Sequence, residues 1–146
     1  MPIATKENKL DISSEKKIEA AAIQFRQFLK IGDIIYLYGE IGVGKTTFAK
    51  YLIHEYQKFH NIKLTEVTSP TFNIMNEYNV GDIIIKHYDL FRLKSNKEIK
   101  NLNLFESNEQ SILLIEWPQI IQKNPDSILK LYFEYGQDYK NRFIKF

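Results

Sequence analysis

The chain has 146 residues, of which 44% are apolar, 14% aromatic and 26% charged, so its composition is that of a globular domain and excludes wholesale disorder. It contains no cysteine, which excludes a disulfide scaffold, a cysteine-based metal site and a thiol nucleophile. Its 20 basic and 18 acidic residues give a net charge of +2. The charges are spread evenly along the chain, which therefore shows no basic stripe for gripping nucleic acid by itself.

The sequence also lacks the features of a membrane or secreted protein. No apolar run approaches the roughly 18 residues of a membrane span. The start of the chain, MPIATKENKLD, lacks the apolar core of a signal peptide. No repeat, low-complexity tract or linker interrupts residues 1–146. We therefore expect a single cytoplasmic domain without membrane contact.

The first half of the chain predicts strands and helices in alternation. A short strand over Lys9–Ile12 precedes Ser13 and Ser14, either of which can cap a helix. Apolar residues then recur at helical spacing between Ile18 and Leu29. The apolar run Ile34–Tyr38, rich in β-forming residues, predicts a central strand covered on both faces. A glycine-rich segment and a second amphipathic helix follow this strand.

The second half of the chain predicts further strands and one short helix. The strands are expected at Ile74–Tyr78 and Ile83–Tyr88 around a turn at residues 79–82, at Ser111–Glu116, and in a last hairpin of Ile128–Tyr135 and Arg142–Phe146, with the helix at Asn96–Glu106. Strands that alternate with helices predict an α/β fold. We expect one domain with a central mixed, largely parallel sheet, flanked by helices and with antiparallel hairpins at the edge.

The glycine-rich segment GEIGVGKTT, at residues 39–47, matches the phosphate-binding pattern G-x-x-x-x-G-K-[ST] of P-loop proteins. A random match in a chain of this length has a chance below about 1%. Lys45 is expected to contact the β- and γ-phosphates, and the Thr46 hydroxyl to bind Mg²⁺. We therefore expect ATP and magnesium as cofactors. The predicted phosphate-binding residues are Gly39, Glu40, Ile41, Gly42, Val43, Gly44, Lys45, Thr46 and Thr47.

A P-loop site also needs acidic side chains at the ends of neighbouring strands, opposite the lysine. Glu116 ends a strongly apolar strand and is expected to hold Mg²⁺ together with Thr46. Asp89 ends the strand before it and is expected to orient a water molecule or to tune a neighbour. We predict Lys45, Asp89 and Glu116 as the catalytic residues, and the division of roles between the two acids stays open.

Four further features each have two interpretations. Residues 69–72 (SPTF) form either a loop that approaches the γ-phosphate or an ordinary entrance to a strand. Arg92 either serves function, by stabilising phosphate charge or contacting a partner, or makes a surface salt bridge. Trp117 contacts the nucleotide or packs in a core or an interface. His87 lies two residues before Asp89, and a structural role is favoured for it.

Four segments in this order resemble the TsaE family, also called YjeE, which are bacterial P-loop ATPases needed to form threonylcarbamoyladenosine in tRNA. They are GEIGVGKTTF at residues 39–48, SPTF at 69–72, HYDLFRL at 87–93 and EWP at 116–118. The similarity covers nearly the whole chain. The chain departs from the family pattern at Glu40, where Asp is frequent, at Val43, where Ala is frequent, and at Phe91, where Tyr is common.

The resemblance implies an ATPase that hydrolyses ATP slowly and acts with two partners, TsaB and TsaD. TsaD transfers the threonylcarbamoyl group, so this chain would reach tRNA only through the complex. The resemblance implies that Lys45 and the loop amides bind the phosphates. It also implies that Thr46 and Glu116 bind Mg²⁺ and that Asp89 serves hydrolysis. It also brings an N-terminal segment and the C-terminal hairpin toward the adenine, for which Ser13 and Arg142 are candidates.

Three other functions compete with this interpretation. A small P-loop kinase usually adds a lid with several arginines, whereas this chain has only Arg26, Arg92 and Arg142. A GTPase selects guanine with an Asn-Lys-x-Asp pattern, which the sequence does not contain. A non-catalytic scaffold controlled by nucleotide stays open, and a measurement of ATP turnover would separate it from an ATPase.

Overall fold

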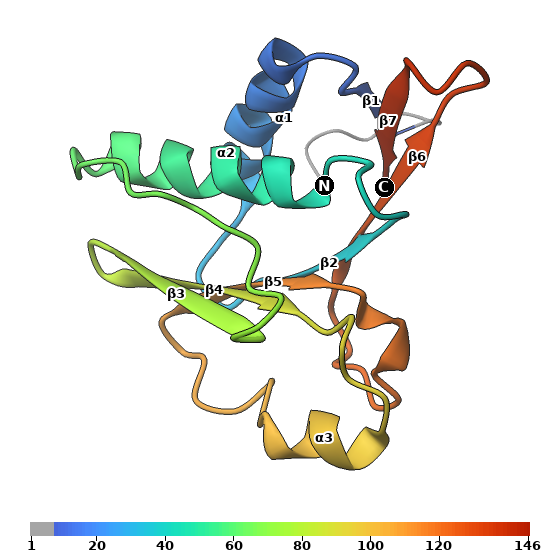
Figure 1. Ribbon diagram of the computed structural model, residues 1–146. Helices are drawn as coiled ribbons and strands as arrows, with labels where there is room; N and C mark the ends of the chain where they lie inside the picture. Colours follow the sequence, from blue (N-terminus) through green and yellow to red (C-terminus); the bar gives the residue numbers. More distant parts are fainter. Residues whose placement is uncertain (1–7) are drawn as a thin grey trace.

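The computed structural model describes residues 8–146 (Figure 1). Residues 1–7, which we expected to belong to the same domain and to carry no secretion signal, lie outside the described part. The strands are β1 (Lys9–Asp11), β2 (Ile34–Tyr38), β3 (Met75–Val80), β4 (Ile83–Asp89), β5 (Ser111–Glu116), β6 (Leu129–Tyr135) and β7 (Arg142–Lys145). The helices are α1 (Glu15–Phe28), α2 (Lys45–Phe59), α3 (Asn96–Asn101) and the 3₁₀ turn η1 (Pro118–Ile120).

All seven strands form one sheet in the order β1-β7-β6-β2-β5-β4-β3. The four middle strands β6, β2, β5 and β4 are parallel, while β3 pairs antiparallel with β4, and β7 pairs antiparallel with both β6 and β1. This arrangement confirms the predicted α/β class, with a largely parallel centre and antiparallel hairpins at the edges. It also brings the carboxyl ends of β2, β4 and β5 to the same edge of the sheet.

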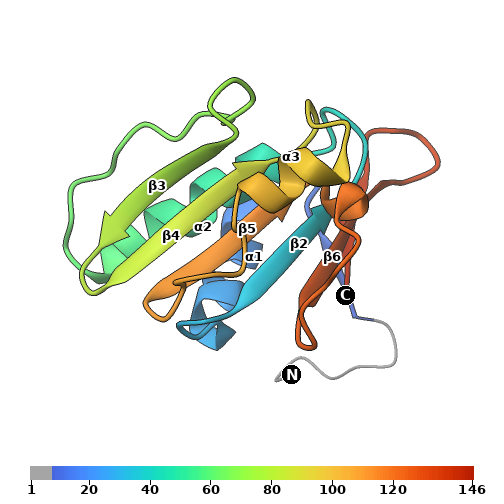
Figure 2. The ribbon, with the colours of Figure 1, turned by 90° about the horizontal axis from the view of Figure 1, so that it is seen from below.

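Helices cover both faces of the sheet, as Figures 1 and 2 show from two directions. α1 and α2 pack on one face, where Phe25 and Phe48 meet edge to face with their ring centroids 5.6 Å apart. α3 and the segments around it cover the other face, over Tyr36, Leu113 and Ile115. Within residues 8–146, no helix is both long and apolar enough to cross a bilayer.

Most of the expected boundaries agree with the structure to within two residues, and the backbone explains two of the deviations. The helix predicted over Asn96–Glu106 ends already at Asn101, because Asn103 adopts a left-handed backbone conformation (φ 50°) that a helix cannot continue through. The turn predicted at residues 79–82 is tighter, because Val80 pairs with Ile83 and leaves only two residues between the strands. At the start of α1, Ser14 is the residue that caps the helix, accepting a hydrogen bond from the Lys17 amide at 3.2 Å.

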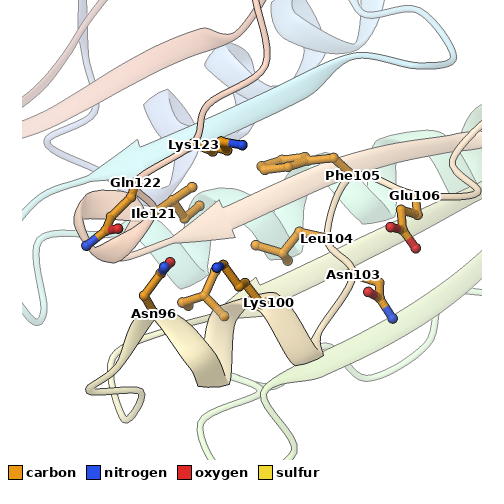
Figure 3. Close-up of a pocket in the computed structure, with 10 residues that line it drawn as sticks. Asn96, Lys100, Asn103, Leu104, Phe105, Glu106, Ile121, Gln122 and Lys123 are labelled. Atoms are coloured by element: carbon orange, nitrogen blue, oxygen red, sulfur yellow. The ribbon is translucent and has the colours of Figure 1, made fainter.

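A cavity of about 610 Å³ opens beside α3 (Figure 3). Its walls come from α3, from the loop after it and from the segment after η1, and the buried side chains Ile99, Leu104 and Ile121 contribute to its lining. None of the motif residues predicted from the sequence lines this cavity. The motif residues lie instead at the carboxyl edge of the sheet.

Candidate functional site

The segment between β2 and α2 forms a tight loop that depends on its glycines. Gly39, Gly42 and Gly44 have φ values of 152°, 82° and 119°, which side chains rarely adopt. A Cβ atom at Gly39 would also lie only 2.8 Å from the Phe133 carbonyl oxygen on β6. The glycines therefore let the backbone turn sharply and pass close against the neighbouring strand.

The N-terminus of α2 faces the site without a side-chain cap. Gly44 is the N-cap residue, and the first backbone bond of the helix runs from the Phe48 N–H to the Gly44 carbonyl oxygen at 2.9 Å. The N–H groups of Lys45, Thr46 and Thr47 thus precede the helical ladder. Such a helix end favours an anion, because the N–H groups and the helix dipole both present positive charge to it.

Lys45 is almost completely buried, with 4% of its surface exposed. Its Nζ atom donates a hydrogen bond to the Gly39 carbonyl oxygen and lies 3.6 Å from the centre of the Trp117 ring. Burial lowers the pKa of this ammonium group, while the nearby Glu116 and Asp89 carboxylates act in the opposite direction. A phosphate beside Lys45 would add to the charge that favours the ammonium form.

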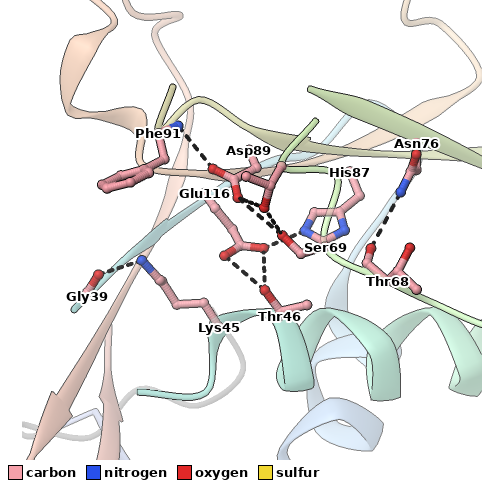
Figure 4. A network of polar contacts seen from close by, with 11 residues as sticks. Gly39, Lys45, Thr46, Thr68, Ser69, Asn76, His87, Asp89, Phe91 and Glu116 are labelled. Carbon is pink, nitrogen blue, oxygen red and sulfur yellow. Dashed lines mark hydrogen bonds and ion pairs between the residues drawn. The ribbon is translucent and has the colours of Figure 1, made fainter. Parts of the chain in front are cut away.

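The two predicted acids lie side by side at the ends of adjacent strands, because β4 and β5 pair Asp89 with Glu116. Thr46 Oγ1 donates to the Glu116 carboxylate, at 3.0 Å from Oε2 and 3.2 Å from Oε1 (Figure 4). Asp89 Oδ2 accepts hydrogen bonds from the hydroxyl groups of Ser69 (3.3 Å) and Thr71 (3.4 Å). The structure therefore brings together Lys45, Thr46, Asp89 and Glu116.

This set of side chains fits a magnesium ion. Mg²⁺ prefers oxygen ligands and usually takes only one or two carboxylates, with phosphate and water as its other ligands. Glu116 is 3% exposed and already within hydrogen-bond distance of the Thr46 hydroxyl, so one carboxylate and one hydroxyl converge beside the phosphate-binding loop. Thr46 and Glu116 are the residues that would hold the ion.

The site is a pocket of about 350 Å³, and all its lining residues except Arg142 belong to the four sequence motifs. Its lining consists of Ile41, Gly42, Gly44, Lys45, Thr46, Thr47, Ser69, Thr71, Asp89, Phe91, Glu116, Trp117 and Arg142. Gly39 and Glu40 line a neighbouring cavity together with residues 133–137 and Tyr139, and Val43 is buried. Ser13 does not line the 350 Å³ pocket, although its Oγ atom accepts a hydrogen bond from the Arg142 N–H at 3.0 Å.

Five side chains in or near the pocket have contacts that the sequence left open or missed. His87 is completely buried, and its Nε2 atom lies 2.6 Å from Glu116 Oε2, so it contacts the site directly. His87 and Asp89 are two positions apart on β4, so their side chains lie on the same face of the strand, and this spacing could have indicated a contact with the site. Ser69 and Thr71 reach the site, and Trp117 covers Lys45. Arg92 donates to the carbonyl oxygens of Thr71 and Phe72 and thereby braces their loop, rather than making a surface salt bridge.

Comparisons with known proteins agree with this geometry. The sequence profile of a family described as "Threonylcarbamoyl adenosine biosynthesis protein TsaE" matches residues 12–144. The crystal structure of YdiB from Bacillus subtilis superimposes with a TM-score of 0.72 at 28% identity, covering 98% of this chain and 86% of that one.

Curated proteins from several bacteria are also similar, and each is named "tRNA threonylcarbamoyladenosine biosynthesis protein TsaE". The protein of Rickettsia conorii is 39% identical over 76% of this chain and 61% of its own length. The protein of a Nostoc species is 32% identical over 89% of this chain and 80% of its own length. The match with the Rickettsia conorii protein thus spans about three fifths of that protein. On the profile and on these relatives, the chain belongs to the TsaE family.

Proposed function

We propose that the chain is a cytoplasmic ATPase that binds ATP with Mg²⁺, hydrolyses it slowly and serves the formation of threonylcarbamoyladenosine in tRNA. The observation that carries this proposal is the convergence of Thr46 with the buried Lys45 and Glu116 at the uncapped N-terminus of α2. The pathway is supported by the names of the relatives, which are biosynthesis proteins for this modified nucleoside in tRNA.

The roles of the residues follow from their positions. The loop amides and the Lys45 ammonium group would bind the phosphates, and a bound Mg²⁺ would withdraw charge from the phosphate oxygens. Thr46 can turn the lone pairs of its hydroxyl oxygen toward the ion while its O–H group still points to Glu116, since the hydroxyl already donates to that carboxylate. Asp89 faces the same space and accepts from Ser69 and Thr71, so a water held there would lie beside its carboxylate.

Partner proteins of the TsaB and TsaD kind belong to the same proposal, with tRNA reached only through the complex. Exposed apolar side chains surround the opening of the pocket, where contact with water alone would favour polar side chains. Ile41 is 70% exposed and Phe91 52%, and Phe72, next to Thr71, is 86% exposed. Apolar side chains gathered around one opening are typical of a surface that contacts another protein.

Calorimetric titration with ATP and Mg²⁺ tests the binding step. Lys45→Ala should weaken ATP binding at least about 100-fold, because it removes a charged hydrogen bond from a desolvated phosphate site. The matched control is Lys50→Ala on the same helix, whose side chain does not line the pocket and which should bind ATP as the parent chain does. Unchanged binding by the Lys45 variant would contradict the proposed phosphate site.

Turnover measurements test the catalytic step and the partners. Glu116→Ala should fold normally but lose most Mg²⁺-dependent hydrolysis, whereas full activity would move the metal role to Asp89. The same assay is repeated with the purified TsaB and TsaD proteins, and a pull-down with and without ATP asks whether they associate with this chain. ATP binding without turnover under both conditions would indicate a nucleotide-controlled scaffold instead of an ATPase.

A further inference from the structure

His87 occupies a place in β4 where packing alone would be served by an apolar side chain. It is 0% exposed, and its neighbours Ile85 and Leu114, on its own strand and at its pairing position on β5, are also 0% exposed. Burying an imidazole without hydrogen bonds has a desolvation cost that a leucine does not have. What distinguishes His87 is its 2.6 Å contact with Glu116 Oε2.

The surroundings determine where the proton of this contact lies. A carboxylate oxygen can only accept, so the proton sits on His87 Nε2 and is donated to Glu116. The other ring nitrogen, Nδ1, is buried and has no hydrogen-bond partner among the described residues. A proton on Nδ1 would be a buried donor without an acceptor, at a cost of about 1–3 kcal/mol. The geometry therefore favours the tautomer that carries its proton on Nε2.

The Glu116 carboxylate is therefore held from two sides. His87 donates to Oε2 from the sheet side, and Thr46 Oγ1 donates to the same carboxylate from α2 (Figure 4). A glutamate has several rotatable bonds, so either contact alone would leave the carboxylate freer to rotate. Two donors from two different elements fix its direction more strongly than one donor can.

We propose that His87 is a positioning residue, whose Nε2–H fixes the Glu116 carboxylate so that it and Thr46 face the Mg²⁺ of the bound nucleotide. The inference rests on the proposed function, because it assigns a role within the same ATP site. His87 touches neither the nucleotide nor the ion in this proposal. It acts through Glu116 alone.

Three variants separate positioning from packing. His87→Leu keeps an apolar volume but removes the donor, and His87→Asn has an amide too short to reach Glu116. His87→Gln has a longer amide whose N–H group can reach the place of Nε2. If His87 positions Glu116, the glutamine variant should keep the effect of Mg²⁺ on ATP binding better than the leucine and asparagine variants. A purely structural role does not predict that the glutamine variant is the best of the three.

The main measurement is ATP binding by calorimetry with and without Mg²⁺. In His87→Leu, the gain in ATP affinity due to Mg²⁺ should fall about 10-fold, because loss of a group that orients a metal ligand typically costs 10–100-fold in metal affinity or activity. Binding of ATP without Mg²⁺ should stay the same. In turnover assays with Mg²⁺, kcat should fall and KM for ATP should rise by a similar factor, because KM approaches Kd when hydrolysis is slow. His87→Gln should restore most of these effects.

A spectroscopic measurement tests the inference on the unaltered protein. Long-range ¹H–¹⁵N NMR spectra distinguish the two histidine tautomers, and the signal of His87 is identified by its loss in His87→Gln, since the chain also contains His54 and His60. The inference predicts that Nε2 of His87 carries a proton. A proton on Nδ1 alone would overturn it whether or not the variants fold.

The outcomes also separate this inference from the proposed function. If the parent chain binds no ATP, or binds it without any effect of Mg²⁺, the proposed function fails first. If the parent chain behaves as proposed while His87→Leu is only less stable to heat and keeps the normal effect of Mg²⁺, the positioning role is wrong and the proposed function stands.

Discussion

Buried ionisable side chains gather at one edge of the sheet. Lys45, His87, Asp89 and Glu116 are all less than 9% exposed, and each lies within or beside the pocket at the N-terminus of α2. Burying charges costs free energy that their mutual attraction repays only in part. At the level of single residues, this concentration is therefore better explained by a charged ligand than by the stability of the fold.

Trp117 should report nucleotide binding by its fluorescence. It is the single tryptophan of the chain, it lines the pocket, and its ring lies 3.6 Å from Lys45 Nζ. Phosphates that bind Lys45 change the charge next to the indole, so ATP with Mg²⁺ should change the emission intensity in a saturable titration. Trp117→Phe should lose the signal while calorimetry still shows binding. A constant emission during binding that calorimetry detects would contradict the placement of Trp117.

The sequence revealed those site residues whose spacing the chemistry itself dictates. Lys45 and Thr46 follow the glycines at fixed distances because the loop must wrap a phosphate, and Asp89 and Glu116 end apolar strands. The contact between His87 and Glu116 could not be predicted, because it depends on the pairing register of β4 and β5. Neither the motif at residues 87–93 nor the motif at residues 116–118 indicates by itself how the two strands are aligned.

At the scale of elements, Asp11 joins the end of β1 to the start of α1. Oδ1 accepts from the Ser13 N–H at 2.8 Å, and Oδ2 pairs with Lys17 Nζ at 2.9 Å. Hydrogen bonds from Ser13, followed by those from Lys17, lower the pKa of Asp11 from 3.8 to about 2. The charged form is therefore favoured by folding, and its contribution to stability is present above pH 3.8 and is lost as the pH falls through about 2.

Asp11→Ala should accordingly lower the free energy of unfolding at pH 7 by about 0.5–1 kcal/mol, a small value because the pair is exposed and screened by water. The difference from the parent chain should shrink as the pH falls from about 4 toward 2. Urea unfolding at several pH values measures it, with Asp126→Ala at an exposed loop position as the control. A difference that grows toward low pH would show that the interaction has been assigned wrongly.

The loop between β2 and α2 should depend on Gly39 more than the turn before β2 depends on Gly32. Both glycines have positive φ values, 152° and 97°, so alanine strains the backbone at either position. At Gly39 the added Cβ would also collide with Phe133 on β6, whereas nothing lies within 4 Å at Gly32. Gly32→Ala should cost about 1 kcal/mol. Gly39→Ala should lower the free energy of unfolding clearly more and should also weaken ATP binding. Thermal unfolding and calorimetry measure the two effects. Equal effects of the two substitutions would argue against the close packing of this loop on β6.

Elements with a strong apolar pattern were predicted to within a residue or two, as β2 and β5 show. The helix over residues 96–106 was predicted too long, because its amphipathic pattern continues into a segment whose apolar residues Leu102 and Leu104 are packed without being helical. Apolar residues of a loop that packs on a sheet can have the same spacing as the apolar face of a helix. The sequence pattern alone therefore does not distinguish such a loop from a helix.

At the scale of the whole molecule, the two ends of the described chain together support the loop between β2 and α2. The Ile12 N–H donates to the Arg142 carbonyl oxygen at 2.8 Å, and β1 pairs with β7. The nearest atoms to a Cβ placed on Gly44 are Ile12 Cδ1 at 3.8 Å and Arg142 Nη1 at 3.9 Å. The sequence predicted both strands but not their pairing, because it joins residues more than 130 positions apart.

Ile144 on β7 should therefore matter for stability although it lies next to the end of the chain. It is 0% exposed within the main core, and truncating such a side chain leaves a cavity, so Ile144→Ala should lower the free energy of unfolding by about 2–4 kcal/mol. Ile31→Ala, at a position that is 44% exposed, is the matched control and should cost well under 1 kcal/mol. Urea unfolding measures both variants, and equal stabilities would show that β7 is not part of the cooperative core. If the folded chain binds ATP as proposed, ATP at 100 times its Kd should stabilise it by about 2.7 kcal/mol and thereby offset much of the loss in Ile144→Ala.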